Sequence, residues 1–191
     1  THLQSESRTN ILHHMGMIYA RWALKAQGLG ATEADELFAE AEESFRAART
    51  SSRFNSYPYY SAAWLYCERA RKSTGTQALR LICSGFRLVD EGIANLPESE
   101  TKGWDIEGKL VAALSDALAT TAELDALCEH EPDDYGYLYA RLAIMGIDSK
   151  YSKEGAVNLL MQSLDTSELP HASTVGLLLR LVEDLPTQFS I

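Results

Sequence analysis

The feature that most constrains the fold is a stretch of nine residues that occurs twice. Gly16–Leu24 reads GMIYARWAL, and Gly136–Ile144 reads GYLYARLAI. Gly, Tyr, Ala, Arg and Ala are identical, and most other positions exchange one bulky apolar residue for another. A helical unit written twice in one chain predicts stacked helical repeats, because each unit buries its apolar stripe only against a neighbouring unit.

Almost every segment has the periodicity of an α-helix, and none alternates convincingly as a strand does. The sequence therefore predicts an all-α chain of about eight helices joined by short turns. In the first helix, one apolar stripe contains Ile11, Leu12, Met15, Ile18, Tyr19 and Trp22. In the second helix we expect the buried side to contain Leu37, Phe38, Ala41, Phe45 and Ala48, and in the helix over Thr76–Asn95 we expect the inward residues to be Leu79, Ile82, Phe86, Val89 and Ile93. We expect helices over the ranges Ser7–Ala26, Pro58 to about Ser73, Thr76–Asn95, Trp104–Cys128 and His171–Asp184. Three more helices are expected from their starting signals: one after an N-cap at Thr32, one beginning at Pro132 and one after an N-cap at Ser152.

Composition narrows the class of protein. The 191 residues suit one domain, and a hydrophobic content of 46% excludes a disordered chain. A net charge of −10 repels phosphate backbones, so we expect no nucleic acid partner. No apolar run reaches the roughly 18–20 residues of a membrane span, so we expect no membrane partner. The chain opens on Thr1, which favours a fragment of a longer polypeptide.

The three cysteines, Cys67, Cys83 and Cys128, are odd in number and form no CxxC pair. This pattern favours buried thiols in a reducing cytoplasm over disulfides or a metal site.

The spacing within the repeated segment resembles the tetratricopeptide repeat (TPR). That family has a Gly followed three residues later by a Tyr in the first helix of each hairpin, and an A-x3-F pattern in the second. The distance from the first-helix Tyr to the second-helix Ala is longer here than a 34-residue unit permits. The resemblance therefore implies a divergent TPR-like α-α superhelix of stacked hairpins over residues 1–191. The matching residues are Gly16, Tyr19, Ala41, Phe45, Ala48, Gly136 and Tyr139.

In TPR proteins the first helix of each hairpin lines the concave wall. The resemblance thus implies that Arg21 and Arg141 occupy equivalent wall positions. Two guanidinium groups on an acidic protein would clamp a carboxylate or phosphate of a partner. His13 and Met17 beside Arg21, and Tyr137 beside Arg141, complete the predicted partner-binding residues. The alternative is that each arginine pairs with a neighbouring acid between helices.

No constellation predicts catalysis. The chain has no GxSxG elbow, no phosphate-binding GxxxxGK[ST] loop and no HExxH pair. His13 and His14 are adjacent and diverge by about 100° on a helix, so they do not share one metal ion. We expect no catalytic residue, no metal and no cofactor. An aromatic cluster suggests either a recognition surface or core packing: Tyr57, Tyr59, Tyr60, Trp64 and Tyr66.

These observations favour a non-enzymatic scaffold that binds a protein or peptide through a helical-repeat groove. One alternative is a regulatory or sensor domain of a larger signalling or defence ATPase, because the chain has no initiator Met and because the run from Ala47 through NSYPYY resembles the helical arrays that follow such ATPases. Another is an all-α enzyme or small-ligand binder with its site inside the bundle. Exposed ends of repeat arrays associate, so a homodimer through terminal helices is a further expectation.

Overall fold

The structure is a computed structural model, and it describes residues 2–28, 33–101, 105–119, 124, 127–128, 131–146, 148–167 and 171–184. Within these ranges the regular structure is α-helical, which confirms the all-α prediction. A short helix, α5 (Glu98–Thr101), accompanies eight helices of at least 13 residues. These are α1 (His2–Gly28), α2 (Glu33–Ser51), α3 (Ser56–Ala70), α4 (Gly75–Asn95), α6 (Ile106–Leu118), α8 (Pro132–Met145), α9 (Lys153–Thr166) and α10 (Ala172–Asp184).

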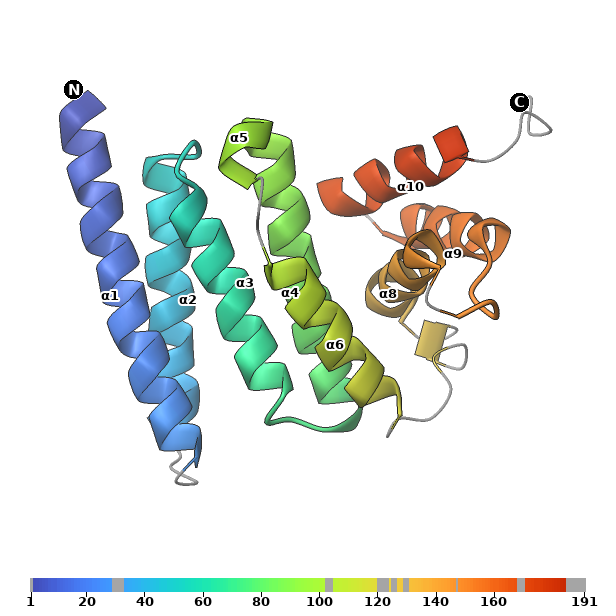
Figure 1. Ribbon diagram of the computed structural model, residues 1–191, viewed down its shortest axis with the longest axis horizontal. Coiled ribbons are helices and arrows are strands. Elements are labelled where there is room, and N and C mark those ends of the chain that lie inside the picture. Colours follow the sequence, from blue (N-terminus) through green and yellow to red (C-terminus); the bar gives the residue numbers. More distant parts are fainter. Residues whose placement is uncertain are drawn as a thin grey trace.

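Consecutive helices pair as hairpins, α1 with α2, α3 with α4, and α8 with α9. The hairpins stack side by side, with α1 at one end and α8–α10 at the other (Figure 1). Helix α6 packs on α3 and α4, and α10 contacts α4, α8 and α9. None of the helices in the described ranges has the length and hydrophobicity needed to cross a bilayer.

Local signals fix several helix ends. The Ser152 hydroxyl accepts a hydrogen bond from the Gly155 N–H at 3.0 Å, which confirms the predicted N-cap of α9. Pro132 is the first residue of α8, as predicted. Helix α3 begins at Ser56, two residues earlier than predicted, because the side chain of Asn55 caps it. The expected N-cap Thr32 lies outside the described residues.

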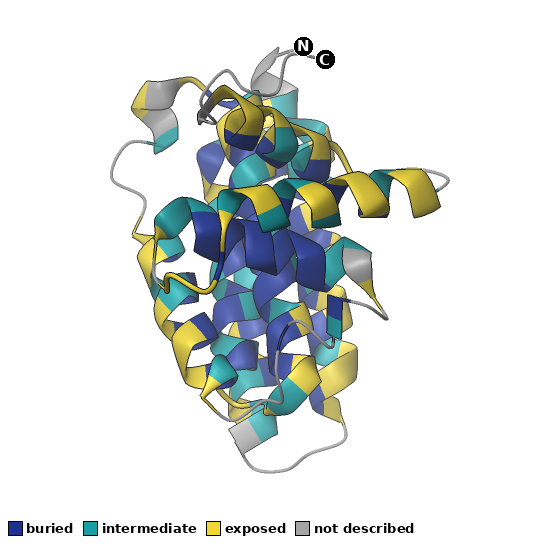
Figure 2. Ribbon diagram, turned by 90° about the vertical axis from the view of Figure 1, so that its right-hand side faces the viewer, coloured by how far each residue is buried: buried dark blue, intermediate teal, exposed yellow. Residues whose placement is uncertain are grey.

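The core runs between the helices along the stack (Figure 2). The predicted inner faces of α2 and α4 are largely confirmed, since Phe38, Phe45, Ile82 and Phe86 are buried. Ile93 is an exception: it was expected to face inward, but it lies exposed near the end of α4.

Helix α1 packs through the face opposite to its apolar stripe. Its buried positions among the described side chains are small residues, Thr9, Gly16, Ala20 and Ala23, whereas 59% of Trp22 is exposed. A Cβ added at Gly16 would lie 2.6 Å from Cε1 of Phe45, so only the small face allows this close approach to α2. The expectation that the apolar stripe would be buried was therefore wrong for four of its members, Ile11, Met15, Ile18 and Trp22, which are exposed.

Both copies of the repeated segment lie in the first helix of a hairpin, α1 and α8. The Gly of each copy faces the second helix of its own hairpin. Gly16 faces Phe45 of α2, and a Cβ added at Gly136 would lie 3.4 Å from Cβ of Leu159 on α9. The repeated glycine therefore has the same packing role twice.

Candidate partner-binding surfaces

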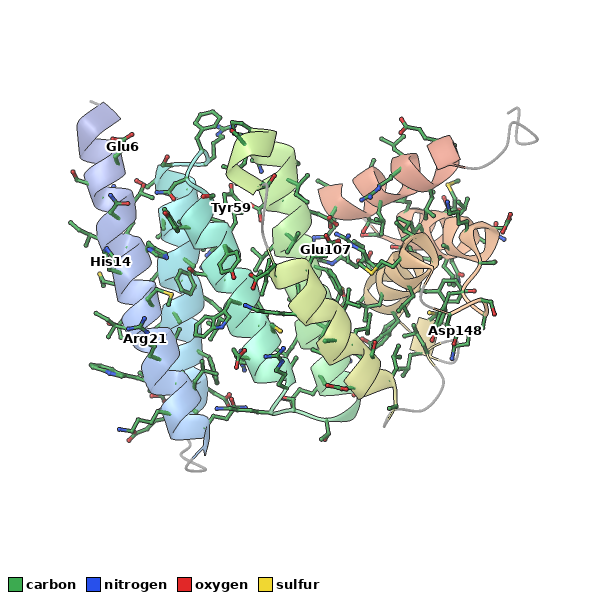
Figure 3. The ribbon with its side chains drawn as sticks, in the orientation of Figure 1. Glu6, His14, Arg21, Tyr59, Glu107 and Asp148 are labelled. Carbon is green, nitrogen blue, oxygen red and sulfur yellow. The ribbon has the colours of Figure 1, made fainter. Side chains whose placement is uncertain are left out.

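The second-copy arginine, Arg141, lies at the centre of a buried charge network. Only 1% of Arg141 is exposed. Its guanidinium pairs with Asp90 of α4, and its Nη1 lies 2.9 Å from Oε1 of Glu107 on α6. The Tyr137 hydroxyl donates to Asp90, and its oxygen accepts from Nε of Arg141 at 3.2 Å. The network thus joins α4, α6 and α8, and Figure 3 shows Glu107 on the α6 side of this junction.

The charges in this network compensate one another. Burial acts to lower the pKa of Arg141, but Tyr137, Asp90 and Glu107 outweigh the burial and raise that pKa. Burial, followed by the Asp90 charge, raises the pKa of Tyr137, so its phenol stays protonated and donates to the carboxylate. Arg141 and Tyr137, which the sequence placed on an open wall, therefore lie in the interior and hold helices together.

The first-copy residues lie on an open surface. Arg21 and His14 are exposed on α1 at the end of the stack (Figure 3), and Met17 is half-buried. No ion pair among the described residues includes Arg21. The predicted equivalence of Arg21 and Arg141 is therefore incorrect, because α4 and α6 cover the second copy and no described helix covers the same side of the first.

His13 lies at the boundary between α1 and α3. Its Nε2 is 2.9 Å from the Ser61 hydroxyl, and its ring lies 6.0 Å from that of Phe45. The residue is half-buried, so it contributes to packing between helices.

Acid should weaken the protein through His13. Burial, and then the neighbouring His14, lowers the pKa of His13 from 6.5. The unfolded chain therefore binds more protons here than the native chain below about pH 6.5, and the stability contributed by a neutral His13 is lost as the pH falls. We expect His13→Gln, which keeps a hydrogen-bonding partner for Ser61, to reduce the loss of thermal stability between pH 7 and pH 5. Equal pH dependence in the variant and the parent protein would contradict this role.

A cleft of about 700 Å³ opens on the surface of the stack. It lies among α2, α3, α4 and His171 at the start of α10, and it adjoins a second cleft of about 500 Å³ that shares Arg46, Arg49 and Glu91. This joint cleft therefore does not lie on the predicted wall of first helices, because α2 and α4, the second helices of their hairpins, supply most of its lining.

Arg49 is a largely enclosed cation of this joint cleft. Its side chain is 15% exposed, and its Cζ lies 5.6 Å from the centre of the Tyr59 ring. The nearest carboxylate, Glu91, is 3.8 Å from Arg49 Nε, which is long for an ion pair. Burial lowers the pKa of Arg49 more than Glu91 and the nearby tyrosines raise it. The protein therefore holds a partly dehydrated guanidinium with spare hydrogen-bonding capacity.

Arg87 forms the other side of the cleft and attaches α10 to α4. Its Nη1 donates to the hydroxyls of Ser173 and Thr174 at 3.0 and 3.1 Å, and its Nη2 donates to the Asp133 carbonyl at 2.8 Å. Its Cζ lies 4.6 Å from the centre of the Tyr137 ring. Hydrogen bonds thus hold the Arg87 side chain in place, whereas Arg49 has the longer and weaker contact with Glu91.

Sequence reasoning missed the arginines of the cleft, although the sequence contains a signal for them. Arg46 and Arg49 are three residues apart and so lie on one side of the end of α2, and Arg53 follows four residues later, just after the helix ends at Ser51. Because acidic residues dominate the earlier part of the same helix, the helix was interpreted as an acidic one, and its cationic end was not recognised. Of the predicted aromatic cluster, Tyr57 is exposed and Tyr59 is buried.

The cysteines and the possible metal ligands offer no further site. Cys67, Cys83 and Cys128 are all buried free thiols, as predicted. Burial raises the pKa of Cys67 and of Cys83. In the described part of the chain, no three His, Cys, Asp or Glu residues gather closely enough to hold a metal ion.

Comparison with protein-family models, curated proteins and solved structures finds no match to this chain.

Proposed function

We propose that this protein is a non-enzymatic interaction scaffold that binds an acidic peptide, or a peptide-like segment of a partner domain, in the cleft between α2 and α4. The observation that supports the proposal most directly is Arg49, which lies at 15% exposure in an open cleft with its nearest carboxylate 3.8 Å away. A carboxylate on the ligand would give this guanidinium the close, charge-assisted pairing that Glu91 does not supply.

The cleft favours an extended peptide over a small anion. The two adjoining spaces of about 700 and 500 Å³ share Arg46, Arg49 and Glu91 and run along α2 and α4. Glu91 lies at their junction, and Glu40, Glu42 and Glu43 also line the larger space, so the cleft disfavours a ligand that is negative throughout. A peptide with separated acidic and apolar or basic residues satisfies both Arg49 and Glu91.

The helical scaffold supplies preorganisation. Tyr59 supports the Arg49 guanidinium, and Arg87 fixes the α10 side, so little conformational freedom would be lost on binding. The hairpins that carry the two Gly-x2-Tyr-Ala-Arg segments support a divergent TPR-like array. Three free buried thiols support residence in the cytoplasm.

Selection of peptides from a random display library tests this proposal. We expect the selected peptides to be enriched in Asp and Glu, and Arg49→Gln to weaken their binding about tenfold, the loss of one charge pair of about 1.4 kcal/mol. Arg71→Gln is the matched control, because Arg71 is exposed at the C-cap of α3 and pairs locally with Glu68 at 3.0 Å. Selected peptides without acidic residues, or equal binding by both variants, would contradict the proposal.

A further inference from the structure

The outward side of α1 presents large apolar side chains that the fold does not use. Ile11, Met15, Ile18 and Trp22 follow one another at intervals of four, three and four residues and are all exposed. Side chains at these spacings lie along one side of a helix. We call these four residues the α1 stripe. Trp22 also meets the ring of Tyr19 edge-on at 6.4 Å, which gives the stripe an aromatic end.

The second copy of the repeated segment shows what covers such a surface. All nine residues from 135 to 143 in α8 are buried, whereas only three of the corresponding residues from 15 to 23 in α1 are buried. Tyr135, Leu138 and Leu142 correspond to the exposed Met15, Ile18 and Trp22. In the second copy, neighbouring helices cover the surface that is open in the first.

The helices that contact Arg141 supply carboxylates. Asp90 comes from α4 and Glu107 from α6, and both pair with Arg141. Arg21 has the corresponding place in the first copy, three residues after Ile18 and adjacent to the stripe. The chain thus contains two copies of the Tyr-Ala-Arg segment in different surroundings. In the second copy, the arginine pairs with carboxylates from packed helices, whereas in the first copy the arginine is exposed.

The charges beside the stripe are basic, although the chain as a whole carries −10. Helix α1 contains the bases Arg8, Arg21 and Lys25 and a single acid, Glu6. Arg8 and Lys25 lie three residues before Ile11 and three residues after Trp22, so they border the two ends of the stripe. In an antiparallel pair of two α1 helices, Arg8 of one copy would face Lys25 of the other, which disfavours self-association.

We propose that the α1 stripe docks an amphipathic helix of a partner protein, with carboxylates bordering its apolar residues. Trp22 anchors the partner helix, and Arg21 pairs with a carboxylate as Arg141 pairs with Asp90 and Glu107. This surface lies on α1, outside the residues that line the cleft, so its test is independent of the proposed peptide-binding function.

Selection from a library of helices displayed on a rigid scaffold tests the inference. Each library member has the same apolar stripe, and the bordering positions vary among acidic, basic and neutral residues. We expect the selected helices to carry Asp or Glu at these positions. Their binding should fall about 30-fold in Trp22→Ala, as for an aromatic hot spot, and about tenfold in Arg21→Gln. Arg49→Gln should leave it unchanged, which separates this site from the cleft.

Three results would overturn the inference. Selected helices with basic or neutral borders would exclude recognition through Arg21. Concentration-dependent dimerisation that is lost in Ile18→Asp, measured by analytical ultracentrifugation, would assign the stripe to a second copy of this chain. Binding of the protein to phosphatidylserine vesicles that is lost in Trp22→Ala would assign it to a membrane surface. Circular dichroism of each variant checks that the helices remain folded.

Discussion

Replacing Arg141 with Met should lower the free energy of unfolding by about 3–5 kcal/mol, because it removes one partner of a buried ion pair and leaves the other uncompensated. Asp90 would retain only the Tyr137 hydroxyl, and the contact between α6 and α8 through Glu107 would be lost. Urea unfolding followed by circular dichroism measures the change. Met keeps most of the side-chain volume, so the expected loss is electrostatic rather than a cavity effect.

Two further variants separate this explanation from a general effect of the substitution. Arg21→Met changes the corresponding residue of the first copy, which is exposed, and should alter stability by no more than about 0.5 kcal/mol. Combining Arg141→Met with Asp90→Asn removes the uncompensated charge as well, so the double variant should be more stable than Arg141→Met alone. Similar losses in Arg21→Met and Arg141→Met would show that the network does not contribute the predicted stability.

Replacing Gly16 with Ala should also destabilise the protein, by about 1–3 kcal/mol, as expected when a well-packed interface is overfilled. The added Cβ would lie 2.6 and 2.7 Å from two atoms of the Phe45 ring. Phe45 is fully buried, with His13 against it, so its ring has little room to move away. The clash should exceed the gain of about 1 kcal/mol in helix propensity that Ala normally brings. Thermal and urea unfolding both measure the result.

Gly136→Ala is the matched control in the second copy. Its added Cβ would lie 3.4 Å from the Cβ of Leu159, which is ordinary contact. We therefore expect a change within about 1 kcal/mol, with helix propensity favouring the variant. A Gly16→Ala protein that is as stable as the parent would mean that α1 and α2 can separate at this point, which contradicts the close packing of the first hairpin.

The sequence was sufficient to predict those features that depend on local pattern. The periodicity of α2 and α4 located most of their inner faces, including Phe38 and Phe86, and the cap at Ser152 located the start of α9. The repeated segment correctly indicated paired helices, because a small residue followed by an aromatic is a packing pattern that acts over one or two turns. The all-α class followed from the same periodicity.

The environments of the two copies were not predictable, because they depend on distant helices. Arg21 and Arg141 have nearly the same sequence neighbours, yet one is exposed and the other meets Asp90 and Glu107 from two other helices. Likewise, the apolar stripe of α1 predicted burial, but the end of a stack has no neighbour on that side. The position of Arg49 in a cleft required the crossing of α2, α3 and α4, which periodicity does not define.

The repeated segment is covered in α8 and open in α1, and one measurement tests directly whether the open copy binds a partner helix. The protein would be labelled with 5-fluorotryptophan, the Trp22 resonance assigned through Trp22→Phe, and its ¹⁹F signal followed during titration with a selected acidic-bordered helix. We predict a saturable shift of the Trp22 signal, and none with the same helix when lysines replace its bordering carboxylates. An unchanged Trp22 signal at saturation, or equal shifts with both helices, would contradict docking of an acidic-bordered helix on the α1 stripe.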